Sequence, residues 1–151
     1  MVLTDSQGGF ATKLGRGPSR TIVARYAGDR RYLGTSSAAA KIGVRSRVTL
    51  HVPPVAREGG TTTFSGKVMA KGAKLGRAGK RLEIQVRIGN AWKAVGRSIR
   101  TNAKGAYALT YRFTADYTDP VRFQFRAVVL RERSFPYLAS VSKRRSVTVS
   151  P

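Results

Sequence analysis

The side chains of this chain that are best suited to chemistry are its lysines and arginines. Among 151 residues, 29 Lys and Arg stand against 7 Asp and Glu, which gives a formal net charge of +22 at pH 7. A field of that sign attracts polyanions, and the planar guanidinium group suits bidentate contact with phosphate or carboxylate. Three segments hold clusters of these cations, and we predict them as a polyanion-binding surface: Lys71, Lys74, Arg77, Lys80, Arg81, Arg131, Arg133, Lys143, Arg144 and Arg145.

A compositional origin of the charge is the interpretation that the sequence favours over a functional one. Arginine outnumbers lysine by 20 to 9, as a GC-rich coding sequence would produce, and arginine readily fills exposed strand positions without binding anything. Most aromatic residues lie in phase with the predicted core, apart from Tyr117 and Phe135, and this argues against a dedicated reader of single-stranded nucleic acid, which stacks bases on exposed rings. Generic binding to cell-wall phosphates, acidic glycans or nucleic acid remains open.

Other kinds of reactive site have little support in the sequence. The chain has no cysteine and one histidine, His51, so it offers neither a cysteine-ligated zinc site nor a Cys–His pair. Asp116 and Asp119 are the nearest pair of acids, and their place around Tyr117 favours turn capping over calcium binding. The glycine-rich loop over 72–79 lacks the P-loop pattern, and no G-x-S-x-G motif occurs. We therefore expect no enzymatic activity, no metal and no cofactor.

Alternation of apolar and polar residues predicts β-strands along most of the chain. The period of two is typical of strands with one buried and one exposed face. In the C-terminal part the predicted strands cover 47–52, 61–70, 81–88, 91–100, 106–113, 121–130 and 146–150. Seven antiparallel strands in roughly 105 residues predict an all-β, immunoglobulin-like β-sandwich. We expect Trp92 to cap its core beside Phe64, Tyr107 and Phe125.

A short sequence near the N-terminus recurs 97 residues later. Residues 4–10, TDSQGGF, correspond to residues 101–107, TNAKGAY, and an internal period indicates repeated modules. We therefore predict two units: residues 1–46 are the C-terminal half of an immunoglobulin-like repeat, and residues 47–151 are a complete repeat. The half repeat is expected to have three strands, at 9–14, 20–26 and 40–44.

The predicted half repeat lacks the sheet that its apolar side chains should face. Phe10, Leu14, Ile22 and Tyr26 would point at strands that this chain does not contain. We expect residues 1–46 to borrow strands from another copy, to lean on the complete module, or to be poorly ordered. The linker of two residues, 45–46, predicts a stiff connection to the complete module.

Several motifs in residues 47–151 resemble the tandem immunoglobulin-like or fibronectin-like repeats of bacterial, particularly actinobacterial, surface proteins. The resemblance rests on FSGKV at 64–68, GKRLEIQ at 79–85, the aromatic Trp92 after a Gly-Asn hairpin, and Pro136-Tyr137 before the last strand. The turn at 101–107 is shared with prealbumin-like sandwiches.

The resemblance implies a non-catalytic structural or adhesive module of a larger cell-surface or secreted protein. Its partners would be neighbouring repeats, polyanions in the alternative function as a cationic binding module, and other copies through strand sharing at residues 1–46. We expect no membrane insertion, because no run of 18 apolar residues occurs. The chain starts without the features of a signal peptide, so an extracellular location would require a signal upstream of these residues.

Overall fold

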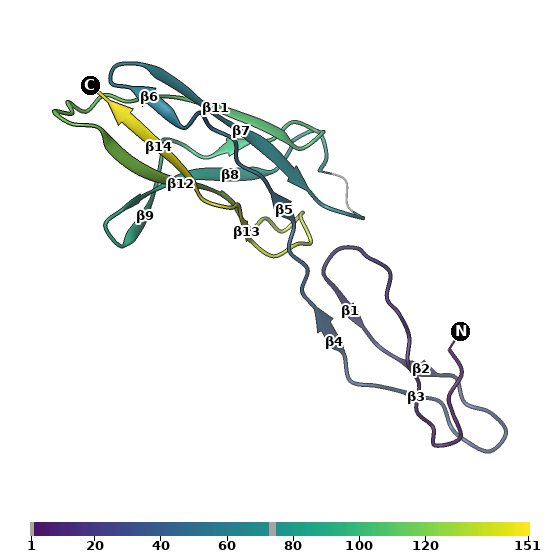
Figure 1. Cartoon of the computed structure of the whole chain (residues 1–151). Helices are drawn as coiled ribbons and strands as arrows, with labels where there is room; N and C mark the ends of the chain where they lie inside the picture. The colour runs from purple at the N-terminus through teal and green to yellow at the C-terminus, as the bar shows by residue number, and fades with distance from the viewer. Residues whose placement is uncertain (1, 73–74) are drawn as a thin grey trace.

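The computed structural model describes residues 2–72 and 75–151, and in these residues all regular structure is β-strand. The strands are β1 (Arg20–Ile22), β2 (Arg25–Tyr26), β3 (Thr35–Ser36), β4 (Ala40–Ile42), β5 (Arg47–Val48), β6 (Val55–Arg57), β7 (Thr61–Met69), β8 (Arg81–Ile88), β9 (Ala91–Ala94), β10 (Ile99–Arg100), β11 (Ala106–Arg112), β12 (Val121–Val129), β13 (Ser140–Val141) and β14 (Arg145–Ser150). The strands β5 to β14 form a sandwich, and β1 to β4 form an arm that projects from one end of it (Figure 1).

The sandwich has two sheets. The smaller sheet has the order β11-β7-β5, and the larger has the order β10-β8-β12-β14-β6, with β9 paired to β8 and β13 to β12. Thus β5, β7 and β11 share one sheet, and β8, β12 and β14 share the other. This is the division between strands A, B, E and strands C, F, G in an immunoglobulin-like sandwich. The prediction of an all-β sandwich is confirmed. One pair, β6 with β14, is parallel, whereas the alternation of side chains predicted antiparallel pairs throughout.

The core lies between the two sheets and is built from the inward-facing positions of each strand. The rings of Phe64 on β7 and Phe125 on β12 meet at a centroid distance of 4.7 Å. Around them lie Leu82, Ile84 and Val147, each at most 1% exposed. Because successive side chains of a strand point to opposite faces, the same alternation that buries these residues leaves arginines on the outer faces.

Trp92 does not lie in the core, and the prediction that it caps the core is wrong. In the ladder of β8 and β9, Trp92 pairs with Arg87, so the two side chains lie on the same, outer face of the larger sheet. The predicted strand over 91–100 is interrupted after β9, and Gly96 has a φ of 69° there. Val95, between β9 and Gly96, is 6% exposed and lies in the core.

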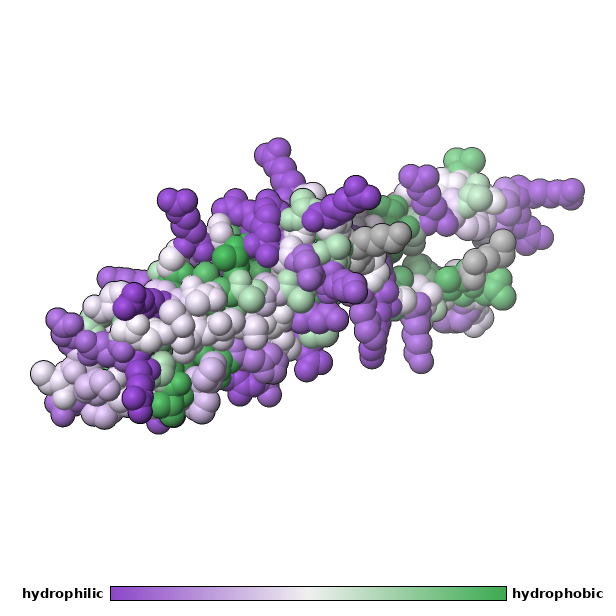
Figure 2. All heavy atoms as spheres, turned by 90° about the horizontal axis from the view of Figure 1, so that it is seen from above, coloured by the Kyte–Doolittle hydropathy of each residue, from purple (hydrophilic) through white to green (hydrophobic). Residues whose placement is uncertain are grey.

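The arm is a long hairpin made of two short antiparallel pairs, β1 with β4 and β2 with β3. Residues 9–14, predicted as a strand, have no regular structure. The arm has no core of its own, because its apolar side chains are largely solvent-exposed: Leu33 93%, Leu3 84%, Tyr32 68% and Phe10 56%. Figure 2 shows hydrophobic atoms on the surface of this end of the molecule.

The two copies of the repeated sequence form turns with the same hydrogen bonds. In each turn a side-chain oxygen, Asp5 Oδ1 or Asn102 Oδ1, accepts bonds from the backbone N–H groups two and four residues later, at 2.7–3.0 Å. The backbone bonds of the two residues also match, and Gly8 and Gly105 have φ values of 79° and 82°. Such φ values favour glycine.

The residues that follow the two turns have different surroundings. Tyr107 is 6% exposed and lies in the core, whereas its counterpart Phe10 is 56% exposed. The same turn therefore leads into a packed sheet in one copy and into a segment without regular structure, residues 9–14, in the other.

Candidate functional site

Eight of the ten basic residues predicted as a polyanion-binding surface are exposed, as their clustering in loops and strand ends led us to expect. Lys74 lies outside the described residues. The exposed residues are Lys71, Arg77, Arg81, Arg131, Arg133, Lys143, Arg144 and Arg145. Figure 2 shows hydrophilic side chains projecting from the molecule along its whole length. Because the chain has 29 Lys and Arg against 7 Asp and Glu, most of its charged side chains are basic.

Lys80 is the exception, and its assignment to the surface is wrong. It is 2% exposed, its Nζ pairs with Glu132, and the ring of Phe135 lies 4.3 Å from the nitrogen. The carboxylate also accepts bonds from Arg100 Nη2 at 3.1 Å and from the backbone N–H of Arg81 at 3.2 Å. A buried charge requires such compensation, so Lys80 is held within the fold by these contacts and is not available to a ligand.

Glu132 is the acid around which this cluster is built. Its burial raises the pKa, but the hydrogen bond from Lys80, the N–H of Arg81 and the charges of Lys80 and Arg100 outweigh burial and hold the pKa of Glu132 below its ordinary value. The carboxylate is thus ionised at neutral pH and anchors the loop that carries Arg131 and Arg133.

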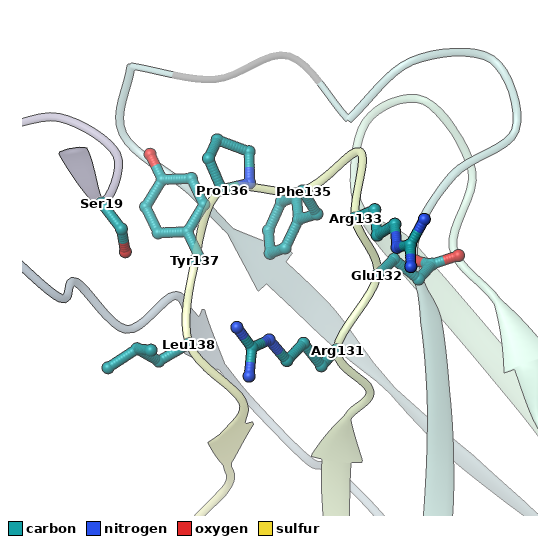
Figure 3. A pocket seen from close by; sticks show the side chains of 8 residues that line it. All are labelled: Ser19, Arg131, Glu132, Arg133, Phe135, Pro136, Tyr137 and Leu138. Atoms are coloured by element: carbon teal, nitrogen blue, oxygen red, sulfur yellow. The ribbon is translucent and has the colours of Figure 1, made fainter. Parts of the chain in front are cut away.

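That loop lines a cleft of about 590 Å³ at the junction of the arm and the sandwich (Figure 3). The lining residues are Ser19, Arg131, Glu132, Arg133, Phe135, Pro136, Tyr137 and Leu138. The Arg131 guanidinium points across the cleft toward Leu138 (Figure 3), while the rings of Phe135 and Tyr137 pack at a centroid distance of 4.9 Å. The one carboxylate of the lining, that of Glu132, is held by Lys80 and Arg100.

A second basic cluster lies on the outer face of the larger sheet, and the sequence prediction did not single it out. The guanidinium carbons of Arg126 on β12 and Arg144 lie 4.1 and 5.6 Å from the ring centroid of Trp92 on β9. Arg126 Nε also donates to Gln85 Oε1 at 3.0 Å. Burial beneath neighbouring side chains, together with the charge of Arg144, lowers the pKa of Arg126 from its ordinary value. Strand alternation placed Arg126 outward, but only the register of β8 with β9 brings Trp92 to it.

The remaining candidates for chemistry stay apart. His51 lies on the edge of the smaller sheet, where its backbone pairs with Ser65, and its side chain is exposed, as are those of Asp116 and Asp119. In residues 2–72 and 75–151, no three His, Asp or Glu side chains converge in a way that could hold a metal ion. The same residues contain no helix long and apolar enough to cross a membrane.

Comparisons with known proteins add a fold-level likeness. No family model matches the chain, and no curated protein matches it. Two solved structures of the CARDB domain of the PF1109 protein from Pyrococcus furiosus match, each at 17% identity: a crystal structure in complex with di-metal ions, covering 73% of this chain and 94% of that chain with a TM-score of 0.42, and a solution structure, covering 72% and 98% with a TM-score of 0.44. Neither likeness identifies a family for this chain.

Proposed function

We propose that this chain is a non-catalytic, immunoglobulin-like repeat that serves as a structural or adhesive spacer in a larger cell-surface or secreted protein. The observation that carries the proposal is the recurrence of one turn, with the same hydrogen bonds, at Asp5 and Asn102. Repeated modules of this kind stack into extended arrays whose units contact their neighbours. The partners of the chain are then the adjacent repeats, and strand sharing between copies is a second way of completing the arm.

The junction between arm and sandwich supports a stiff arrangement. The N–H of Ser19 donates to the Pro136 carbonyl at 2.8 Å, and the N–H of Leu138 donates to the Val44 carbonyl at 2.9 Å. The linker is also bonded to the sandwich, because the hydroxyls of Ser46 and Ser140 lie 2.7 Å apart and are buried. These bonds tie the start of β1 and the C-terminal end of the arm to the sandwich, so a spacer built this way would transmit orientation from one unit to the next.

Backbone ¹⁵N relaxation of the whole chain tests the proposal. We expect amides of β1 and β4 to report the same overall correlation time as amides of β8 and β12. Inserting Gly-Ser-Gly-Ser between Arg45 and Ser46 should shorten the correlation time of the arm alone, since a flexible linker permits independent motion. Independent tumbling of the arm in the unmodified chain would contradict the role of a rigid spacer.

A cationic binding module is the second candidate function, and one observation favours it. Among the described residues both ion pairs involve Glu132, which leaves the exposed arginines of the sandwich other than Arg100 without carboxylate partners. Binding to heparin, duplex DNA and RNA between 50 and 300 mM salt tests this function. Tight, polymer-selective binding that survives 300 mM salt supports it, whereas a steep salt dependence without preference reflects bulk charge alone.

A further inference from the structure

We propose that the outer face of the larger sheet holds a binding site for a linear acidic polysaccharide, centred on Trp92, Arg126 and Arg144. The inference rests on the second candidate function, cationic binding, and gives that function a place in the fold. The site differs from the loop clusters predicted from the sequence, since only Arg144 belongs to both.

The geometry concentrates two positive charges on one aromatic ring. The guanidinium carbon of Arg126 lies 4.1 Å from the Trp92 centroid and that of Arg144 lies 5.6 Å from it. Arg126 is held in place by Gln85. Arg144 is near enough for its charge to lower the pKa of Arg126, so the two cations repel each other and a bound anion would offset that repulsion. A sulfate or carboxylate group accepts two parallel N–H bonds from a guanidinium fork.

Acidic side chains do not neutralise this cluster. On the same face Glu83 accepts a hydrogen bond from Gln85 Nε2 at 3.2 Å, and neither Arg126 nor Arg144 has a carboxylate within salt-bridge distance among the described residues. Further along the face Arg122 contacts the Ser146 hydroxyl at 3.3 Å. Arg122 thus continues the line of cations along β12 from Arg126, which suits a chain of anionic groups.

The surroundings favour a polysaccharide over nucleic acid. Single-stranded nucleic acid binds by stacking bases on exposed aromatic rings, but the Trp92 ring is already covered by Arg126. The DNA major groove admits a helix or a two-stranded ribbon, whereas Arg126 is on β12, between β8 and β14 in the sheet. A thin polymer with a charge on its sugar rings can lie across such a broad face.

Trp92 provides its own readout, because it is the one tryptophan of the chain. A bound sulfate or carboxylate draws the guanidinium groups away from the indole and so changes its emission. We expect heparin and polygalacturonate to change the Trp92 fluorescence saturably at 150 mM salt. In Arg126→Gln/Arg144→Gln the affinity should fall about tenfold or more, and the slope of log K against log salt should fall by roughly one for each arginine removed.

The matched control removes two charges from the opposite side of the sandwich. Arg47 and Lys67 are exposed on the smaller sheet, and Arg47→Gln/Lys67→Gln should leave the affinity within about twofold. Urea unfolding verifies that each variant is folded; if the double variant is not, Arg144→Gln and the titration of the unmodified chain carry the test.

Each contrary outcome identifies what fails. Binding without any change in Trp92 emission, or equal weakening by the control, overturns this site while leaving a cationic binding module intact. Absence of binding by all polymers overturns both. Tighter binding of duplex DNA than of heparin through the same two arginines overturns the assignment to polysaccharide.

Discussion

Gly66 on β7 lies where neighbouring atoms approach the backbone too closely to leave room for a side chain. A Cβ at this position would lie 2.1 Å from the Thr49 carbonyl oxygen and 2.6 Å from the Tyr107 hydroxyl, which donates to that same carbonyl. Gly66→Ala must therefore force Tyr107 off its partner, and we expect it to lower the free energy of unfolding by about 2–3 kcal/mol. Gly15→Ala, where a Cβ meets nothing within 4 Å, should change it by less than about 0.5 kcal/mol. Urea midpoints distinguish the two; equal midpoints would mean that Tyr107 moves at little cost.

Glu132 gives the stability of the chain a specific dependence on pH. Its pKa is lowered in the folded state from an ordinary value of 4.5, so the folded state binds the proton less tightly than the unfolded state does. The stabilisation is present above pH 4.5 and is lost as the pH falls through the folded pKa. The pKa of Asp29 is also lowered, chiefly by the Tyr26 hydroxyl, so the difference between the unmodified chain and Glu132→Gln isolates Glu132.

At pH 7 we expect Glu132→Gln to cost about 3 kcal/mol, because it leaves the buried Lys80 ammonium without its counter-ion. Lys80→Met/Glu132→Gln should recover most of that loss, since both charges are then removed. Thermal unfolding of the three variants at pH 7 and pH 3.5 measures both effects. A loss on acidification that is the same with and without Glu132 would disprove the role assigned to this carboxylate.

Lys80 and Trp92 show which residue environments a sequence leaves undetermined. Lys80 follows a glycine-rich, basic loop, so local composition indicated an exposed cation; its burial depends on Glu132, which is 52 residues away. The placement of Trp92 depends on the register of β8 with β9, and a shift of one residue moves every side chain of a strand to the other face. The burial of Lys80 depends on a partner distant in the sequence, and the placement of Trp92 depends on strand pairing. Local sequence patterns encode neither.

At the scale of the elements, the arm should be the least stable part of the chain. Its strands are two or three residues long, and the arm exposes the apolar side chains of Phe10, Tyr26 and Leu33. In contrast, β7, β8 and β12 have eight or nine residues and line the core. Local opening therefore costs less free energy in the arm. We expect amide hydrogen exchange at residues 20–42 to be at least a hundredfold faster than in β8 and β12. Equal protection in a chain shown to be monomeric by sedimentation would contradict this.

The long strands were predictable because they alternate over seven or more residues, and β8 has the predicted bounds. The short strands could not be predicted in this way. β6 follows Pro53-Pro54 and has three residues, and β13 has two, so neither shows a period. Residues 9–14 alternate as a strand would, but no neighbouring strand pairs with them, and an isolated strand leaves its backbone groups without partners.

For the molecule as a whole, the dominant long-range force is repulsion within a net charge of +22. Self-repulsion destabilises a compact state, and salt screens exposed charges over about 10 Å at 0.1 M. Raising sodium chloride from 20 to 300 mM should therefore raise the melting temperature by about 3–6 °C. Sodium acetate should give the same curve if screening is the cause; a different response to the two anions would indicate specific anion binding instead.

The parallel pairing of β6 with β14 determines how the sandwich would respond to mechanical tension. The C-terminus lies at the end of the sandwich opposite the arm (Figure 1), so a pull on the two ends of the chain draws β14 along its own axis. β14 is bonded on one side to β12 and on the other to β6. Their hydrogen bonds would have to shear together and could not open one at a time, which would make this strand a clamp against stretching.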